Sequence, residues 1–224
     1  MTTSITGTSP GGGPTSARQR TQFEVTGTPD LDAVTRTLTL AFAADPILDW
    51  AIPRGSAERD RWLAGFFRTV TGMLLDHRGL VGSTPGYSAL TVWSPPGEPA
   101  LDDAEQARFD ERLAAACGPH GDRAVALMRA LDEHYPTDLP PHFHVMFSAT
   151  RPEPGASGSA VLLVHTLLRT EHLGGHGIYA EASTPQNRDL WQGMGMRPIG
   201  DEITLPDGGP SLYPLWRDAS APRA

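Results

Sequence analysis

Two groups of residues combine types and spacing that suit chemistry, and the first is a run of small side chains. That run reads Gly155-Ala156-Ser157-Gly158-Ser159-Ala160. It follows residues 142 to 150, which alternate like a buried strand, and it overlaps the start of apolar residues at helical spacing from 156 to 170. The first N–H groups of a helix lack partners and carry the positive end of its dipole. Because every side chain in the run is small, it predicts a loop that binds an anion such as a pyrophosphate.

The second group has the chemistry needed to move a proton. His142 and His144 lie on one face of the predicted strand, because strand side chains alternate with a period of two. Glu181 lies on the next predicted strand along the chain. A histidine, or a glutamate removed from water, can take a proton from an ammonium group directly or through water. Two other interpretations stay open: hydrogen-bonded core histidines, and a His-x-His metal pair, for which no third ligand stands at motif spacing.

The hydrophobic patterns place these groups in a chain of strands and helices. The run Arg151-Pro152-Glu153-Pro154 ends the central strand, because neither proline can donate a ladder hydrogen bond. Strands are predicted at residues 22–25, 80–83, 87–93, 142–150, 178–182, 197–205 and 211–217, helices at 29–44, 58–77, 101–117, 122–134, 156–170 and 184–193, and a short apolar turn or helix at 47–52. The strands at 80–93 and 197–217 are predicted to form hairpins, so the fold class is α+β with a mostly antiparallel sheet.

Length and composition favour one domain. The 224 residues suit a single α/β domain from 21 to 218 with a helical insertion at about 101–135. Residues 1–20 are rich in Thr, Ser and Gly and are predicted to be a disordered tail, and 219–224 form a second tail. No run approaches the roughly 20 apolar residues that span a bilayer, so no membrane partner is expected. Cys117 is the only cysteine, which excludes an internal disulfide and favours a cytoplasmic location.

The charge balance argues against nucleic acid as a partner. The chain has 18 basic and 26 acidic residues, a net charge of −8, and all of its basic residues are arginine. Nucleic-acid binding needs a basic surface that neutralises phosphates. An acidic protein instead attracts cationic small molecules, so an amine is electrostatically compatible with this chain.

Several segments of the chain resemble the GCN5-related N-acetyltransferase (GNAT) superfamily. The strand followed by Pro152-Glu153-Pro154 and then by the small run at 155–160 is similar to the family's nucleotide-side motif. Residues 179–196, YAEASTPQNRDLWQGMGM, resemble the family's late strand and helix, which read Leu-Glu-Ala-Ser, then Asn, then Leu-Tyr-x-x-x-Gly-Phe. His142-Phe143-His144-Val145, AFAADP at 41–46 and VWSPPG at 92–97 are similar to actinobacterial members. The resemblance covers residues 22 to 218 in the expected order.

The resemblance implies a fold, a cofactor and an activity. The fold is an α/β/α sandwich whose two central strands splay apart in a V, and the cofactor is acetyl-CoA or another acyl-CoA. The implied activity is acyl transfer to an amine of a small molecule by direct attack, in a monomer or homodimer. The implied cofactor contacts are the 155–160 loop, the backbone of Ser148, Ala149 and Thr150, and the side chains of Asn187 and Trp191. The implied acceptor pocket contains Asp45, Asp49, Trp50, Phe66, Trp93 and His144.

The chain departs from the family pattern at three positions. Gly155 stands where the family has Gln or Arg, and Ala156 stands where it usually has Gly, so the acyl-CoA loop is degenerate. Trp191 replaces a tyrosine that protonates the departing thiolate in many relatives. An indole N–H only donates and does not ionise, so Trp191 cannot be a general acid. A thiolate leaving group with a pKa of about 8.5 departs at little cost without one.

Two further hypotheses remain open from the sequence. A protein with this fold but without acyl transfer would bind or rearrange a small metabolite without acetyl-CoA. Alternatively, the glycine pattern of the loop followed by Glu181 resembles a dinucleotide-binding fingerprint with its ribose-binding acid. The four-residue spacer at 151–154 breaks the tight strand-to-glycine turn that this fingerprint needs. For Asn187, an ordinary helix-start role is the alternative to contact with a cofactor.

Overall fold

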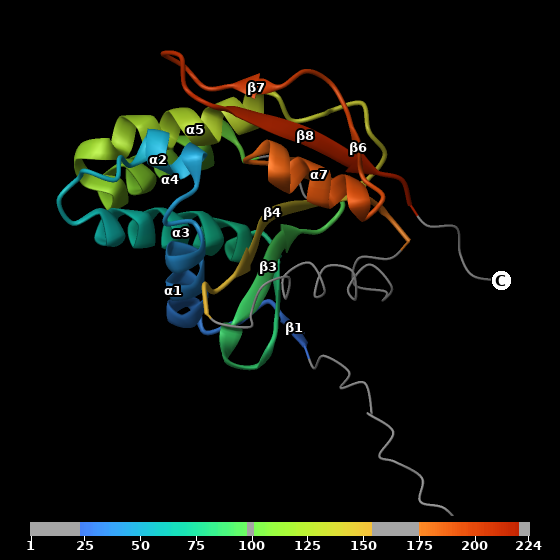
Figure 1. Cartoon of the computed structure of the whole chain (residues 1–224), viewed down its shortest axis with the longest axis horizontal. Coiled ribbons are helices and arrows are strands. Elements are labelled where there is room, and N and C mark those ends of the chain that lie inside the picture. The colour runs from blue at the N-terminus through green and yellow to red at the C-terminus, as the bar shows by residue number, and fades with distance from the viewer. Residues whose placement is uncertain (1–22, 98–100, 154–174, 220–224) are drawn as a thin grey trace, which may run out of the picture.

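The structure, a computed structural model, describes residues 23–97, 101–153 and 175–219 (Figure 1). Within these residues the strands form an eight-stranded sheet in the order β1-β2-β3-β4-β5-β8-β6, with β7 also paired to β8. Only β4 and β5 pair in parallel; the other pairs are antiparallel. The strands are β1 (Glu24–Thr26), β2 (Leu80–Ser83), β3 (Ala89–Ser94), β4 (His142–Thr150), β5 (Gly177–Ala182), β6 (Arg197–Pro198), β7 (Ile203–Thr204) and β8 (Ser211–Arg217). The predicted mostly antiparallel sheet is confirmed.

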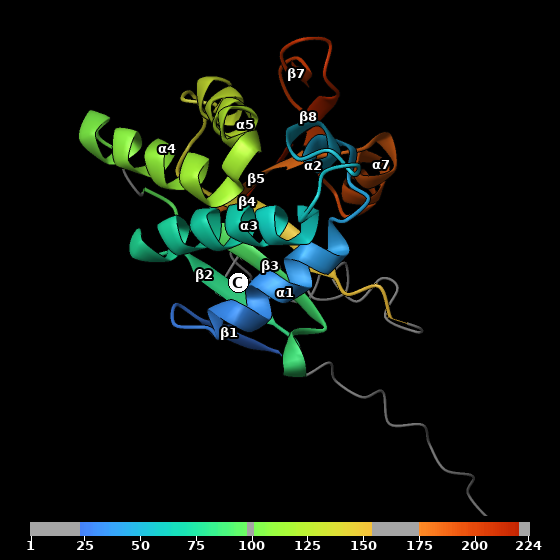
Figure 2. The same ribbon diagram turned by 90° about the vertical axis from the view of Figure 1, so that its left-hand side faces the viewer.

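Helices cover both faces of this sheet. They are α1 (Leu31–Ala41), α2 (Pro46–Ala51), α3 (Arg59–Asp76), α4 (Asp103–Cys117), α5 (Gly121–Glu133) and α7 (Pro185–Gly193). Figure 1 shows α1 and α3 on one side of β3 and β4 and α7 on the other. In Figure 2, α4 and α5 also lie on the side of β4 away from α7. Two buried apolar clusters fill the layers, one against α1 to α5 and a smaller one that includes residues packed from α7.

Side-chain caps explain where α1 and α4 begin. Asp30 accepts hydrogen bonds from the backbone N–H groups of Asp32 and Ala33, at 3.0 and 3.1 Å, at the start of α1. Asp102 and Glu105 form a reciprocal capping box at the start of α4. These caps satisfy helix-end donors that would otherwise lack partners.

A β-bulge in β4 changes which face its side chains occupy. Val92 of β3 pairs with Phe147, but the next residue, Trp93, pairs with Val145, so Met146 is the extra residue. Because of this bulge Val145 and Phe147 contribute to opposite faces, although they are two residues apart. His144 is therefore on the same face as Phe147, the face covered by α1 to α5.

The carboxyl-terminal hairpin differs from its prediction. Instead of one strand at 197–205 there are two short ones, β6 and β7, which both pair with β8. Pro198 has no N–H for the ladder, and Gly200 adopts a φ of 60°, which turns the chain away between the two strands. The long partner strand is as predicted at 211–217. The predicted loop 155–160, the predicted helix 156–170 and the predicted tail 1–20 lie outside the described residues.

In the described part of the chain, no helix combines the length and apolar character needed to cross a bilayer. The longest of these helices, α3, has 18 residues and several charged ones.

Two glycines of α3 test the close packing of α3 against α4. A Cβ on Gly65 would lie 2.2 Å from the carbonyl oxygen of Ala116, whereas a Cβ on Gly72 would meet nothing within 4 Å. Gly65→Ala should therefore lower the free energy of unfolding by about 1–3 kcal/mol, because the helices must move apart. Gly72→Ala, on the same helix, should raise it by up to about 1 kcal/mol through helix propensity. Urea unfolding of both variants would measure the difference, and equal shifts would contradict the packing described.

Candidate functional site

The candidate site lies where β4 and β5 part. Their parallel register runs from His142 and Gly177 to Val145 and Ala180 and ends there, although both strands continue. A pocket of about 80 Å³ occupies the opening, lined by Ser148 from β4 and by Glu181 and Ala182 from β5. The V-shaped splay expected between the central strands is thus present, and it is hollow.

A buried pair of ionisable groups stands at this pocket. His144 Nε2 lies 2.9 Å from Glu181 Oε2, and the two side chains are only 9% and 4% exposed. Because a carboxylate accepts and does not donate, the imidazole N–H is the donor. The other oxygen, Oε1 of Glu181, is buried and has no hydrogen-bond partner among the described residues. A buried carboxylate oxygen without a donor is costly, so a ligand that donates a hydrogen bond would be favoured there.

Two tyrosines surround the imidazole of His144. The ring centroids of Tyr135 and Tyr179 each lie 5.2 Å from it. Burial, together with the nearby carboxylate of Glu181, raises the pKa of Tyr135 to about 12 and raises the pKa of Tyr179 as well. Both phenols therefore stay protonated at neutral pH and hold the His144 ring by packing. The sequence patterns did not identify Tyr135, because its position beside the strand depends on the loop that returns from α5.

His142, the other predicted base, is engaged elsewhere. Its Nδ1 lies 2.8 Å from the carbonyl oxygen of Pro140 and its Nε2 lies 2.8 Å from the hydroxyl of Tyr135. Since a carbonyl only accepts, Nδ1 carries the proton and Nε2 accepts from the tyrosine. Burial lowers the pKa of His142, which keeps the ring neutral. Both of its ring nitrogens thus have partners away from Glu181, and the structure gives it a hydrogen-bonded core position.

A chain of three polar side chains crosses one side of the pocket. Oδ1 of Asp45 accepts from the N–H groups of Ile47 and Leu48, at 2.9 and 3.2 Å, and so caps α2. Its Oδ2 accepts a short hydrogen bond from the Ser183 hydroxyl, and Ser183 accepts from the amide of Asn187 at 3.2 Å. The chain joins α2 to α7, which lie next to one another in Figure 2. Burial is the largest influence on Asp45 and raises its pKa, against the hydrogen bonds that lower it.

His144 bonds to Glu181 but is not itself among the described lining residues. Of the other residues predicted to line an acceptor pocket, Asp45 and Phe66 line the pocket between β4 and β5, as do residues from α5 that the sequence patterns did not single out. Asp49 and Trp50 do not. The carboxylate of Asp49 is bound by Arg54 and Arg59, at 3.2 and 3.7 Å. Trp50 faces the neighbouring helix, where the guanidinium of Arg123 lies 5.4 Å from its ring centroid.

The position of Trp93 differs from its prediction as a residue of the acceptor pocket. It is fully buried and belongs to the cluster on the α7 face, with Val145. The β-bulge at Met146 puts that face opposite to the one that carries His144. Its side chain packs the core and is not among the described residues that line the pocket.

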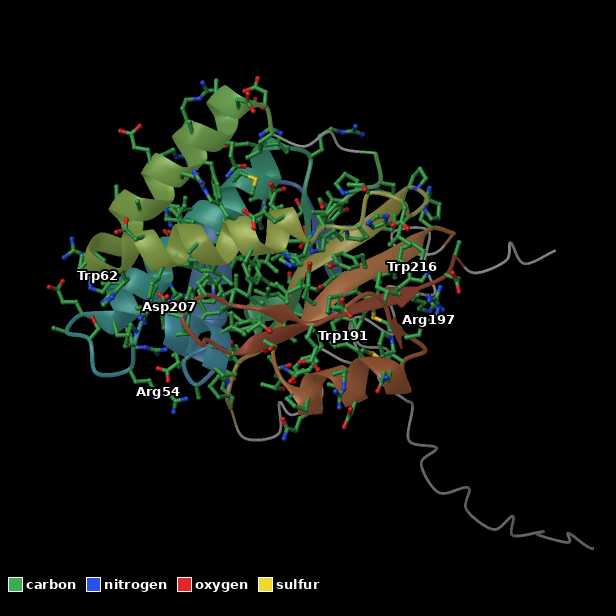
Figure 3. The ribbon with its side chains drawn as sticks, turned by 90° about the horizontal axis from the view of Figure 1, so that it is seen from above. Arg54, Trp62, Trp191, Arg197, Asp207 and Trp216 are labelled. Atoms are coloured by element: carbon green, nitrogen blue, oxygen red, sulfur yellow. The ribbon has the colours of Figure 1, made fainter. Side chains whose placement is uncertain are left out.

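The predicted cofactor contacts divide into three sets. Ser148, Asn187 and Trp191 line the pocket, and Trp191 extends from α7 toward the strands (Figure 3). Ala149 is buried, and it and Thr150 pair with β3 along the other edge of β4. The loop Gly155-Ala156-Ser157-Gly158-Ser159-Ala160 lies outside the described residues.

Comparison with solved structures shows what fold these residues occupy. A histone acetyltransferase HPA2 and related acetyltransferase from Corynebacterium glutamicum is 20% identical with a TM-score of 0.59, over 90% of this chain and 99% of that one. Arylalkylamine N-acetyltransferase 2 from Aedes aegypti is 12% identical with a TM-score of 0.58, over 89% and 99%. An agmatine N-acetyltransferase is 14% identical with a TM-score of 0.53, over 88% and 99%.

The chain thus has the fold of N-acetyltransferases, as the resemblance implied. No family model matches the sequence, and no curated protein matches it. At these identities the likeness extends to the fold, and the chemistry must be argued from the site.

The raised pKa of Asp45 predicts a pH dependence of stability. A raised pKa means that the folded state binds more protons than the unfolded state above the ordinary value of 3.8. The contribution of Asp45 to stability is then present at low pH and falls as the pH rises through this window. The difference in free energy of unfolding, Asp45→Asn minus the parent, should therefore be more positive at about pH 7 than at about pH 4. Urea unfolding at both pH values would test this, with Asp60→Asn as a control for an exposed carboxylate; a difference that does not change with pH would contradict it.

Proposed function

We propose that this protein transfers an acetyl or other short acyl group from an acyl-CoA to the amine of a small molecule. The observation that carries the proposal is the buried Glu181, which binds His144 through one oxygen and leaves the other unpartnered at a pocket between parting strands. The shared fold supports it. Two structural neighbours, named arylalkylamine and agmatine N-acetyltransferases, also support an amine as the acceptor.

The opening between β4 and β5 fits the arm of an acyl-CoA. Beyond Val145 the two strands no longer pair with one another, so an extended chain of amides can take the place of the missing neighbour. Ser148 lines one wall, and the Asn187 amide and the Trp191 indole line the other. The small residues from 155 to 160 are proposed to hold the pyrophosphate. When bound, the acyl-CoA supplies the activated thioester.

The residues of the chain then have separate roles. An amine is mostly protonated at neutral pH, and it must lose a proton before it can attack. Oε1 of Glu181 accepts a hydrogen bond from the ammonium group and takes that proton, while His144 holds Oε2 in place. As the new N–C bond forms and the C–S bond breaks, the attacking nitrogen releases its second proton to solvent. Trp191 cannot donate a useful proton, so the sulfur leaves as a thiolate, which its low basicity permits.

Ligand binding separates this proposal from its alternatives. Acetyl-CoA and CoA should raise the melting temperature, with a stabilisation of about 2.7 kcal/mol when the ligand is present at about 100 times its Kd. NAD and NADP should have no effect. Thermal-shift titrations with all four compounds measure this. Stabilisation by NAD would favour the dinucleotide hypothesis, and stabilisation by none would favour a fold that has lost acyl transfer.

Replacement of Glu181 tests the proton-transfer step. Glu181→Gln keeps the shape but removes the base, so the rate of acetyl transfer should fall by about 10²- to 10⁴-fold. Binding of acetyl-CoA, measured by calorimetry, should be unchanged. Glu24→Gln, an exposed glutamate on β1, is the matched control and should have the parent rate. Full activity of the Glu181 variant would exclude this residue as the base.

A further inference from the structure

We infer that the acceptor is a primary monoamine whose remaining body is apolar and uncharged, in preference to a polyamine or an amino acid. The inference rests on the proposed function and names the substrate class of that same site. Three properties of the pocket wall carry it: the number of available carboxylate oxygens, the absence of basic side chains, and the extent of the apolar surface.

Within the described part of the chain, the pocket offers one place for a cation. Two carboxylates line it, those of Asp45 and Glu181. Both oxygens of Asp45 are already engaged, one by two backbone N–H groups of α2 and the other by the Ser183 hydroxyl. A second ammonium group could use Asp45 only by competing with these bonds. Oε1 of Glu181 is the buried pocket oxygen that has no partner in the described part of the chain.

Among the described residues that line it, the pocket offers no place for an anion. The described residues that line it include no arginine, lysine or histidine side chain. The carboxylate of an amino acid or the phosphate of a phosphorylated amine would lie beside Glu181 and Asp45 without a positive partner. Burying an unpaired charge in such surroundings is strongly unfavourable. Acceptors with a negative group should therefore be rejected.

Much of the wall is apolar, and a large part of this apolar surface comes from the larger face of the sheet. This part is formed by Phe42, Phe66 and Phe147 and by Leu127, Met128 and Leu131 of α5. Such a wall favours an alkyl or aryl body and disfavours a second charged end. The preference should be large, because a single methylene in an apolar pocket changes kcat/KM by about 10- to 200-fold.

A panel of amines tests the substrate class directly. The full-length protein is assayed with acetyl-CoA and hexylamine, phenethylamine, putrescine, spermidine and leucine, and acetyl-CoA binding is measured by calorimetry in parallel. The expected result is a kcat/KM for hexylamine or phenethylamine at least about 10-fold above that for the polyamines and leucine. A preference for polyamines or leucine would overturn the inference and leave acyl transfer standing. Binding of acetyl-CoA without acetylation of either monoamine would also overturn it. Absence of acetyl-CoA binding would instead remove the proposed function.

A size change in the apolar wall tests the position of the acceptor body. Met128 lines the pocket and is 7% exposed, and Met128→Ala enlarges the apolar end without changing charge. Across a series of n-alkylamines, the variant should prefer longer chains than the parent, with a gain of about 10-fold or more for the longer members relative to the shorter. Met73→Ala is the matched control, since Met73 packs against the same core but does not line this pocket. An unchanged chain-length preference in a folded Met128 variant would place the acceptor body elsewhere and contradict the inference.

Discussion

The site depends on the point at which the only parallel pair of strands among the described residues stops pairing. β4 and β5 share four register pairs, from His142 and Gly177 to Val145 and Ala180, and then diverge. Before that point the pairing brings His144 beside the strand that carries Glu181. After it, the strands leave the opening in which the pocket lies. The same divergence therefore produces both the buried acid–base pair and the space beside it.

The bulge at Met146 contributes the second constraint. Without an extra residue in β4, Val145 and Phe147 would share a face, and the helices on that face would pack on a different set of side chains. With the extra residue Met146, the alternation of side chains along β4 shifts by one position beside the pocket. His144 and Phe147 then face the same helices, although they differ by an odd number of positions. Phe147 of the pocket wall and the imidazole of His144 thus come to one site from a single strand.

The sequence predicted the elements of this site better than their contacts. Period-two alternation located β4 at its observed bounds, and helical spacing located α3 within one residue at either end. The pairing of His144 with Glu181 depends on parallel register, which no local pattern encodes. Trp93 was misplaced because a bulge leaves no clear mark in the alternation of residues. Asp49 and Trp50 were misplaced because their partners, Arg54, Arg59 and Arg123, come from elements whose orientation only the fold determines.

Asp45 shows why the number of acidic residues in a pocket does not equal the number of cations it binds. Its carboxylate caps α2, and the bond from Ser183 ties that cap to the turn before α7. The carboxylate of Asp45 thereby joins two elements that lie beside the pocket. Glu181 is different because its carboxylate is bound by a histidine, and its second oxygen has no hydrogen-bond partner in the described part of the chain. A carboxylate with hydrogen-bond partners on both oxygens positions the wall of the pocket. A carboxylate with a partner on only one oxygen remains available to a substrate. This distinction follows from hydrogen-bond satisfaction, which depends on the contacts of the folded chain.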